Sequence, residues 1–130
     1  MPNASDISGT VFVGGSSTNM TRIIGIHGSA VTRADIATIT YSLYSYNKYS
    51  GARTVVNNHD TVALTVHDVI YDALQKDALW TVDTTGYNFR HELDVSTNAA
   101  FAAAGNYLVE YHLQPVSGQI IIVRFRLQAI

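Results

Sequence analysis

Hydrophobic and polar side chains alternate along most of the chain. Between residues 107 and 113, for example, Tyr107, Val109, Tyr111 and Leu113 are separated by single residues that are mostly polar. A period of two is typical of β-strands with one face against a core. The same pattern, with weaker examples near the N-terminus, predicts about seven strands and a short middle one, at residues 10–13, 20–27, 39–44, 53–56, 62–66, 87–94, 107–113 and 121–127.

Turn-forming residues separate these segments, and the spacing is typical of a β-sandwich. Residues 14–17 are Gly-Gly-Ser-Ser, 57–60 are Asn-Asn-His-Asp, and 83–86 are Asp-Thr-Thr-Gly. No linker, internal repeat or low-complexity segment interrupts the pattern. We therefore expect a single all-β domain over residues 1–130, an antiparallel sandwich of about seven strands.

One stretch departs from the period of two. Apolar residues at positions 69, 70, 73 and 74 have helical spacing, and Asp68 before them is a suitable N-cap. This pattern predicts one short helix over about 68–78, with Trp80 packing back onto the sandwich.

The last two strands have a predictable register. Val116-Ser117-Gly118 suits a three-residue hairpin loop in which Gly118 takes a positive φ. That loop places Pro115 opposite Gln119 and Leu113 opposite Ile121. Continuing along the same ladder, Glu110 falls opposite Arg124 and His112 opposite Ile122.

This register leaves apolar residues on the outer face of the sheet, where an exposed antiparallel sheet is normally polar. Either the 68–78 helix or a second subunit would cover them, and both alternatives stay open. The predicted interface residues on this face are Leu108, Ile120, Ile122, Arg124 and Arg126.

Composition narrows the function class. Charged residues make up 14% of the chain and the net charge is −2, so nucleic acid is not an expected partner. No apolar run approaches the roughly 18 residues that cross a membrane. Arginine outnumbers lysine by 6 to 2 and there are 8 tyrosines, a bias also found at protein interfaces.

Candidate chemistry is sparse. The absence of cysteine excludes disulfides and thiolate sites, and Glu110 with His112 forms the one usable metal-ligand pair on a strand face. No H-x-x-x-H, H-E-x-x-H or G-x-S-x-G motif is present. We therefore expect no enzymatic activity, no metal site and no cofactor.

Residues 103–109 resemble the segment that enters the sixth strand of immunoglobulin-like domains. Gly105 and Tyr107 match that segment, while Ala103 replaces its acidic residue and Val109 its cysteine. The resemblance implies that the fold is immunoglobulin-like and that the Tyr107 hydroxyl bonds back to the loop backbone.

More broadly, the chain is similar to small immunoglobulin-like modules of tailed-bacteriophage particles, such as capsid decoration, neck and baseplate proteins. The similarity lies in strands rich in Thr, Ser, Asn and Tyr, without cysteine and without a signal peptide. It implies a structural protein of the virion, assembled in the host cytoplasm, that associates with itself or with other virion proteins.

The alternative is a carbohydrate- or receptor-binding module on the same fold. Tyr44, Tyr46 and Tyr49 cluster near one loop and would form a stacking platform for a glycan. The competing interpretation is that Tyr44 and Tyr46 lie on the outer sheet face beneath a loop or a neighbouring subunit.

Overall fold

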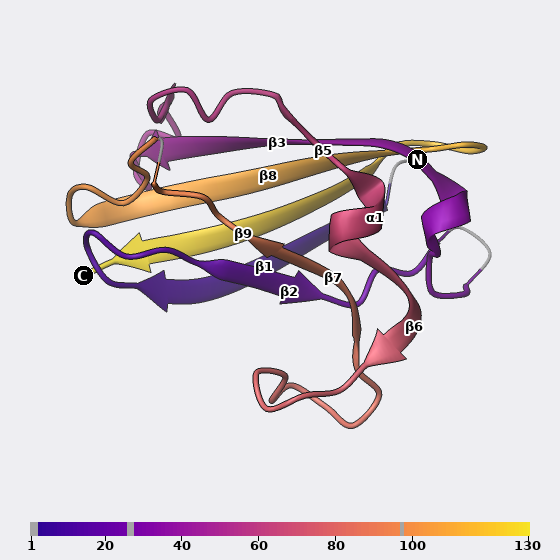
Figure 1. The fold of residues 1–130 in the computed structure, drawn as a ribbon. Coiled ribbons are helices and arrows are strands. Elements are labelled where there is room, and N and C mark those ends of the chain that lie inside the picture. Colours follow the sequence, from indigo (N-terminus) through magenta and orange to yellow (C-terminus); the bar gives the residue numbers. More distant parts are fainter. Residues whose placement is uncertain (1–2, 26–27, 97) are drawn as a thin grey trace.

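The computed structural model describes residues 3–25, 28–96 and 98–130, and these form a β-sandwich of two sheets (Figure 1). The larger sheet has the order β1-β9-β8-β3-β4, with β5 also paired to β3, and the smaller has the order β2-β7-β6. The prediction of an all-β sandwich is confirmed. The strands are β1 (Asn3–Val11), β2 (Thr18–Thr21), β3 (Ile36–Tyr46), β4 (Arg53–Val55), β5 (Val62–Leu64), β6 (Ile70–Gln75), β7 (Tyr87–Glu92), β8 (Gly105–Pro115) and β9 (Ile121–Ala129).

The resemblance of residues 103–109 to immunoglobulin-like domains predicted a hydrogen bond from Tyr107 to the loop before it. The Tyr107 hydroxyl donates a hydrogen bond to the Ala103 carbonyl oxygen, 2.7 Å away. The expected bond from this tyrosine to the preceding loop is therefore present.

The core lies between the two sheets, and the alternation of side chains decides which residues enter it. Val109, Tyr111 and Leu113 of β8 and Val123 and Phe125 of β9 are all buried. The smaller sheet contributes mainly Ile70 and Phe89. The predicted inward faces of the last two strands are confirmed.

The predicted helix over 68–78 is wrong. In this stretch only Val66–Val69 is helical (α1), with Thr65 rather than Asp68 as its N-cap, and the chain continues from Ile70 as strand β6. The one other helical turn in the described residues is the 3-10 turn η1 (Arg33–Asp35). Within the described residues, no helix is long and apolar enough to cross a membrane.

Pairing with β7 explains why this segment is extended. Ile70 is opposite Phe89 and Gln75 is opposite Tyr87. Ile70 is buried between the sheets, whereas Ala73 and Leu74, which completed the helical pattern, are exposed. A partner strand for the backbone and a buried place for Ile70 outweigh the local helical spacing.

Two strands near the N-terminus also differ from the expectation. Residues 3–11 form one long strand that runs parallel to β9, although only 10–13 were predicted. Its sequence is mostly polar, and it lies at the edge of the larger sheet beside β9. The predicted strand over 20–27 begins earlier, at Thr18, and ends at Thr21; its residues 26 and 27 lie outside the described residues.

The register of the β8–β9 hairpin is as predicted. Glu110 is opposite Arg124, His112 opposite Ile122 and Leu113 opposite Ile121, and Gly118 has a φ of 105°. The predicted pair of Pro115 with Gln119 does not form. Pro115 instead pairs with Ile36 at the start of β3.

Phe125 provides a test of the core. Its ring packs edge-on against that of Tyr111, with 5.7 Å between the ring centroids. Phe125→Ala should lower the free energy of unfolding by about 3–5 kcal/mol, because it removes a large buried side chain and leaves a cavity. Denaturant titration measures the loss. Ile122→Ala on the opposite face of β9 is the control, and a cost for Phe125→Ala no larger than that of the control would contradict the assigned faces.

Candidate functional site

The outer face of the larger sheet carries the residues that the sequence singled out. Because side chains alternate, placing Tyr111 inward places Leu108, Glu110 and His112 outward. The ladder then aligns Ser42 with Glu110 and Arg124 across three strands. The next such row consists of Tyr44, Leu108 and Arg126, and the row on the other side of Ser42 consists of Thr40, His112 and Ile122.

Glu110 is the centre of this face and is itself buried. Its carboxylate accepts a hydrogen bond from Arg124 Nε at 2.7 Å, contacts His112 Nε2 at 2.6 Å and forms a longer ion pair with Arg53 at 3.6 Å. Burial alone would raise the pKa of Glu110, but the bonds from His112 and Arg124 outweigh burial and lower the pKa. Glu110 therefore stays ionised, and its charge is neutralised by its neighbours.

The three tyrosines of the proposed glycan platform each have a cation over the ring. Arg53 lies 4.7 Å from the centroid of the Tyr44 ring, and Arg126 lies 5.8 Å from that of Tyr46. Lys48 is 5.4 Å from the centroid of Tyr49. Tyr44 and Tyr46 are half-buried on the sheet, whereas Tyr49 is 89% exposed in the loop between β3 and β4. The three rings thus do not form a bare aromatic platform, because each is paired with a positive charge.

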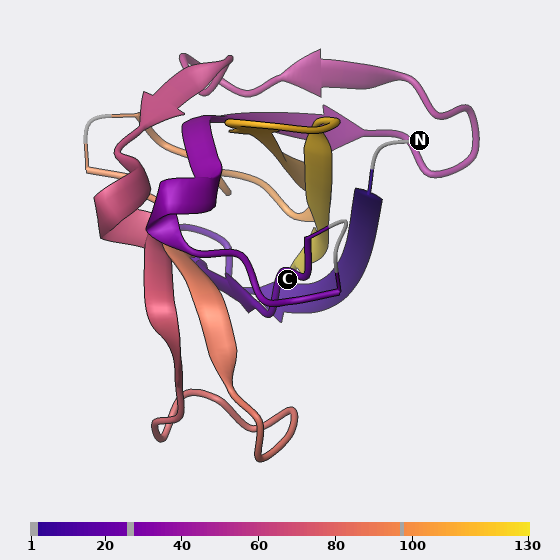
Figure 2. The same ribbon diagram turned by 90° about the vertical axis from the view of Figure 1, so that its right-hand side faces the viewer.

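A hollow of about 320 Å³ opens between the β3–β4 loop and strands β8 and β9, and we call it the arginine hollow. In Figure 2 this loop extends from the sandwich at the upper right. Its lining includes Tyr46, Lys48, Arg53, Leu108, Arg124 and Arg126.

The predicted interface residues are all found on or beside this face. Leu108 is 5% exposed and lies in the arginine hollow with Arg124 and Arg126. Ile120 and Ile122 are half-buried. The 68–78 helix, one of the two expected covers, does not exist, and the short α1 packs on β3, β6 and β7 instead.

A second surface, which the sequence analysis missed, is the loop over residues 76–86 between β6 and β7. Figure 2 shows it projecting from the body of the sandwich at the bottom of the view. Leu79 is 60% exposed at this loop and Val82 is 74% exposed. The predicted helix over 68–78 included the first residues of this loop, and the sequence analysis therefore did not identify the segment as a loop.

Asp83 holds the 76–86 loop in shape. Its carboxylate accepts hydrogen bonds from Trp80 Nε1 at 3.0 Å, from the backbone N–H groups of Thr85 and Gly86, and from Arg22 at 2.8 Å. These bonds, led by the one from Trp80, lower the pKa of Asp83. Asp77 supports the same loop by accepting a hydrogen bond of 2.6 Å from the Tyr87 hydroxyl.

Gly86 closes the loop at its base. Its φ is +109°, and a Cβ atom built at this position would lie 2.5 Å from the Gln75 carbonyl oxygen. Only glycine fits such a close backbone approach. Together with the Asp83 bonds, this constraint ties the base of the loop to β6.

Beside this loop lies a hollow of about 340 Å³ along the open edge of the sandwich, between β1 and β2, and we call it the edge hollow. Its apolar lining includes Ile7, Met20, Leu79, Val82, Phe125 and Leu127. The projecting loop and a recess of mixed apolar and polar lining are therefore neighbours on one surface.

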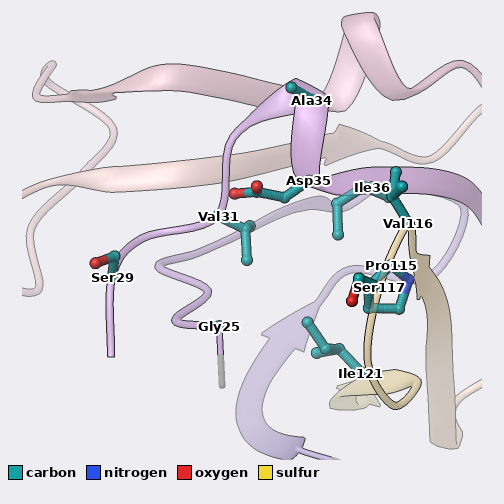
Figure 3. Close-up of a pocket in the computed structure, with 10 residues that line it drawn as sticks. All are labelled: Gly25, Ser29, Val31, Ala34, Asp35, Ile36, Pro115, Val116, Ser117 and Ile121. Carbon is teal, nitrogen blue, oxygen red and sulfur yellow. The ribbon is translucent and has the colours of Figure 1, made fainter. Parts of the chain in front are cut away.

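A third hollow, of about 470 Å³, lies between the segment before β3 and the β8–β9 loop (Figure 3). Figure 3 shows that it is lined by apolar side chains such as Val31, Ile36 and Ile121. Among the described residues that line it, Asp35 is the ionisable one, and its carboxylate accepts hydrogen bonds from the backbone N–H and the hydroxyl of Thr32. These described lining residues offer no further group for chemistry.

Two histidines, His59 and His91, bond to tyrosines of the core. His91 Nδ1 lies 2.7 Å from the Tyr111 hydroxyl, which also accepts a hydrogen bond from Asn19 Nδ2 at 2.8 Å. His59 is buried and lies 2.7 Å from the Tyr41 hydroxyl through Nδ1.

The described residues do not support a metal-binding site. Among them, no three His, Cys, Asp or Glu side chains converge on a point where an ion could bind. Glu110 and His112, the predicted ligand pair, contact each other instead.

The burial of His91 makes stability depend on pH. Burial, with a smaller effect of His59, lowers the pKa of His91 to about 4, against an ordinary value near 6.5. His91 is therefore neutral in the folded protein while the unfolded chain still binds a proton. The free energy of unfolding should be highest above about pH 6.5 and fall as the pH decreases toward 4, by up to about 3 kcal/mol.

Denaturant titrations between pH 8 and pH 5 measure this dependence, because carboxylates contribute little in that range. The control is His91→Gln, which keeps a polar side chain that does not titrate. Its stability should change little over the same range, and an equally steep dependence in this variant would contradict the assignment to His91.

Comparison with known proteins assigns no function to these surfaces. No protein-family model matches the chain, and no curated protein matches its sequence.

Proposed function

We propose that this protein is a non-enzymatic structural module that associates with copies of itself, as an accessory component of a particle such as that of a tailed phage. The observation that carries the proposal is the 76–86 loop, a projection held by side-chain hydrogen bonds that leaves Leu79 and Val82 exposed to solvent. The similarity of strand composition to phage-particle modules supports the setting, which would be a virion assembled in the host cytoplasm.

The rigidity of the loop favours binding. An exposed apolar side chain on a flexible loop loses conformational entropy when it is bound, whereas a loop already held in one shape loses much less. Asp83 accepts its four hydrogen bonds within or beside this loop. We infer that this bonding serves to present Leu79 and Val82 to a protein partner.

A second copy of the chain is the partner that fits best. A symmetric pair needs one surface that complements itself, and here a projecting loop with exposed apolar side chains adjoins the edge hollow, whose lining is partly apolar. The net charge of −2 and the 14% content of charged residues mean that repulsion between copies is weak.

Substitution of Val82 tests this association. Val82→Lys places a charge at the contact and should raise the dissociation constant of the oligomer at least about tenfold, a change of roughly 1.4 kcal/mol. Light scattering over a wide concentration range measures it, and circular dichroism checks that the variant is folded. The matched control is Val116→Lys, since Val116 is 70% exposed in a different loop. A wild-type protein that stays monomeric, or equal effects of the two variants, would overturn the proposal.

The particle setting has a separate test. The coding gene is expected to lie among genes for capsid, portal or tail proteins. A neighbourhood of metabolic genes would contradict the virion assignment while leaving the self-association test unchanged.

A further inference from the structure

We propose that the arginine hollow binds the acidic group of a saccharide, a carboxylate or a sulfate, with a sugar ring lying beside Tyr46. This site is on the outer face of the larger sheet and is separate from the 76–86 loop. The two proposals can therefore fail independently.

The first argument is the concentration of positive charge. The chain has 8 lysines and arginines, and four of them, Lys48, Arg53, Arg124 and Arg126, line this one hollow. Glu110 contacts Arg53 and Arg124, and Asp6 is opposite Arg124 in the β1–β9 register. Even with both carboxylates counted, positive charges exceed negative ones in a protein whose net charge is −2. An anion is the ligand that this hollow attracts.

The second argument is that the arginine side chains are held in place. Arg124 is fixed through Nε by the buried Glu110, and Arg53 both approaches Glu110 and lies over the ring of Tyr44. Guanidinium groups bind carboxylate and sulfate oxygens through paired N–H donors, and side chains that are already positioned lose less entropy on binding. Glu110 thus acts as an internal brace for the arginines rather than as a competing ligand.

The third argument concerns the size of the site and its aromatic wall. A hollow of about 320 Å³ is at the lower end of the range for small-ligand sites and does not form a long groove. A single-stranded nucleic acid requires a positive groove that follows its backbone over several nucleotides. One acidic group attached to a ring fits the observed space better, and Tyr46 stands in the wall of the hollow beside the place of that ring.

The test is isothermal titration of the full chain with four probes. Two are acidic, a heparin-derived tetrasaccharide and tetragalacturonate, which separate sulfate from carboxylate recognition. Cellotetraose is the neutral saccharide, and a short oligothymidylate represents nucleic acid. We expect binding of at least one acidic probe that is tighter than that of the oligothymidylate, and no binding of cellotetraose.

Three variants locate the binding. Lys48→Gln and Arg53→Gln each remove one charge from the arginine hollow, and each should weaken acidic-saccharide binding about tenfold, the effect of one good charged contact. Lys76→Gln removes the same charge from an exposed position outside the hollow and should change binding less than about twofold. All three residues are exposed, so the variants are expected to fold.

Several results would overturn the proposal. Equal weakening by all three variants would show that only net charge matters. Tighter binding of the oligothymidylate would indicate a nucleic-acid site, and equal binding of cellotetraose would show that the acidic group is not recognised. Absence of binding to both acidic probes would exclude the proposed ligand class.

Discussion

The hydroxyl group of Tyr111, fully buried between the sheets, is the constraint on which the rest of the sandwich depends. A buried hydroxyl without partners would cost free energy on the order of 1–3 kcal/mol, so its two contacts must form whenever the sheets pack. Asn19 reaches it from β2 and His91 from β7, and both of these strands belong to the opposite sheet. In a chain without cysteine, these bonds add a specific link between the sheets that apolar packing alone does not provide.

The position of Tyr111 also determines the outer face. A shift of β8 by one residue would expose Tyr111 and turn Glu110 into the core. With Tyr111 inward, Glu110 is level with Arg124 and Leu108 is level with Arg126. The arginine hollow is therefore a consequence of core packing, because the same alternation that buries the aromatic side chains brings the arginines together outside.

The strands on which this argument depends could be predicted from the sequence. Period two identified the inward faces of β8 and β9, and the β8–β9 loop fixed their register, which made the Glu110–Arg124 pair predictable. The errors occurred where pairing with a distant strand decides the structure. The 70–75 segment has helical spacing but is extended because β7 supplies its partner, and polar β1 is a strand because β9 does.

The two candidate surfaces differ in how much of each the sequence could reveal. The sequence analysis identified part of the arginine hollow, in two separate sets. Tyr46 was among the residues predicted to bind a glycan, and Leu108, Arg124 and Arg126 were among those predicted to form an interface. No local pattern shows that the β3–β4 loop brings Lys48 and Arg53 over β8 and β9. The 76–86 loop depends on Arg22 reaching Asp83 across 61 residues of sequence, which spacing cannot predict.

A common principle underlies both surfaces: a buried or shared carboxylate fixes the groups around it. Glu110 positions Arg53 and Arg124, and Asp83 positions Trp80 and the base of its loop. Charge-assisted hydrogen bonds are stronger than neutral ones, so one carboxylate can hold several donors in a fixed arrangement. Only 14% of the residues are charged, and these two acidic side chains each hold the groups of one surface in place. That ordering leaves different side chains facing solvent, cationic ones around Glu110 and apolar ones beyond Asp83, and the two surfaces therefore suit different classes of partner.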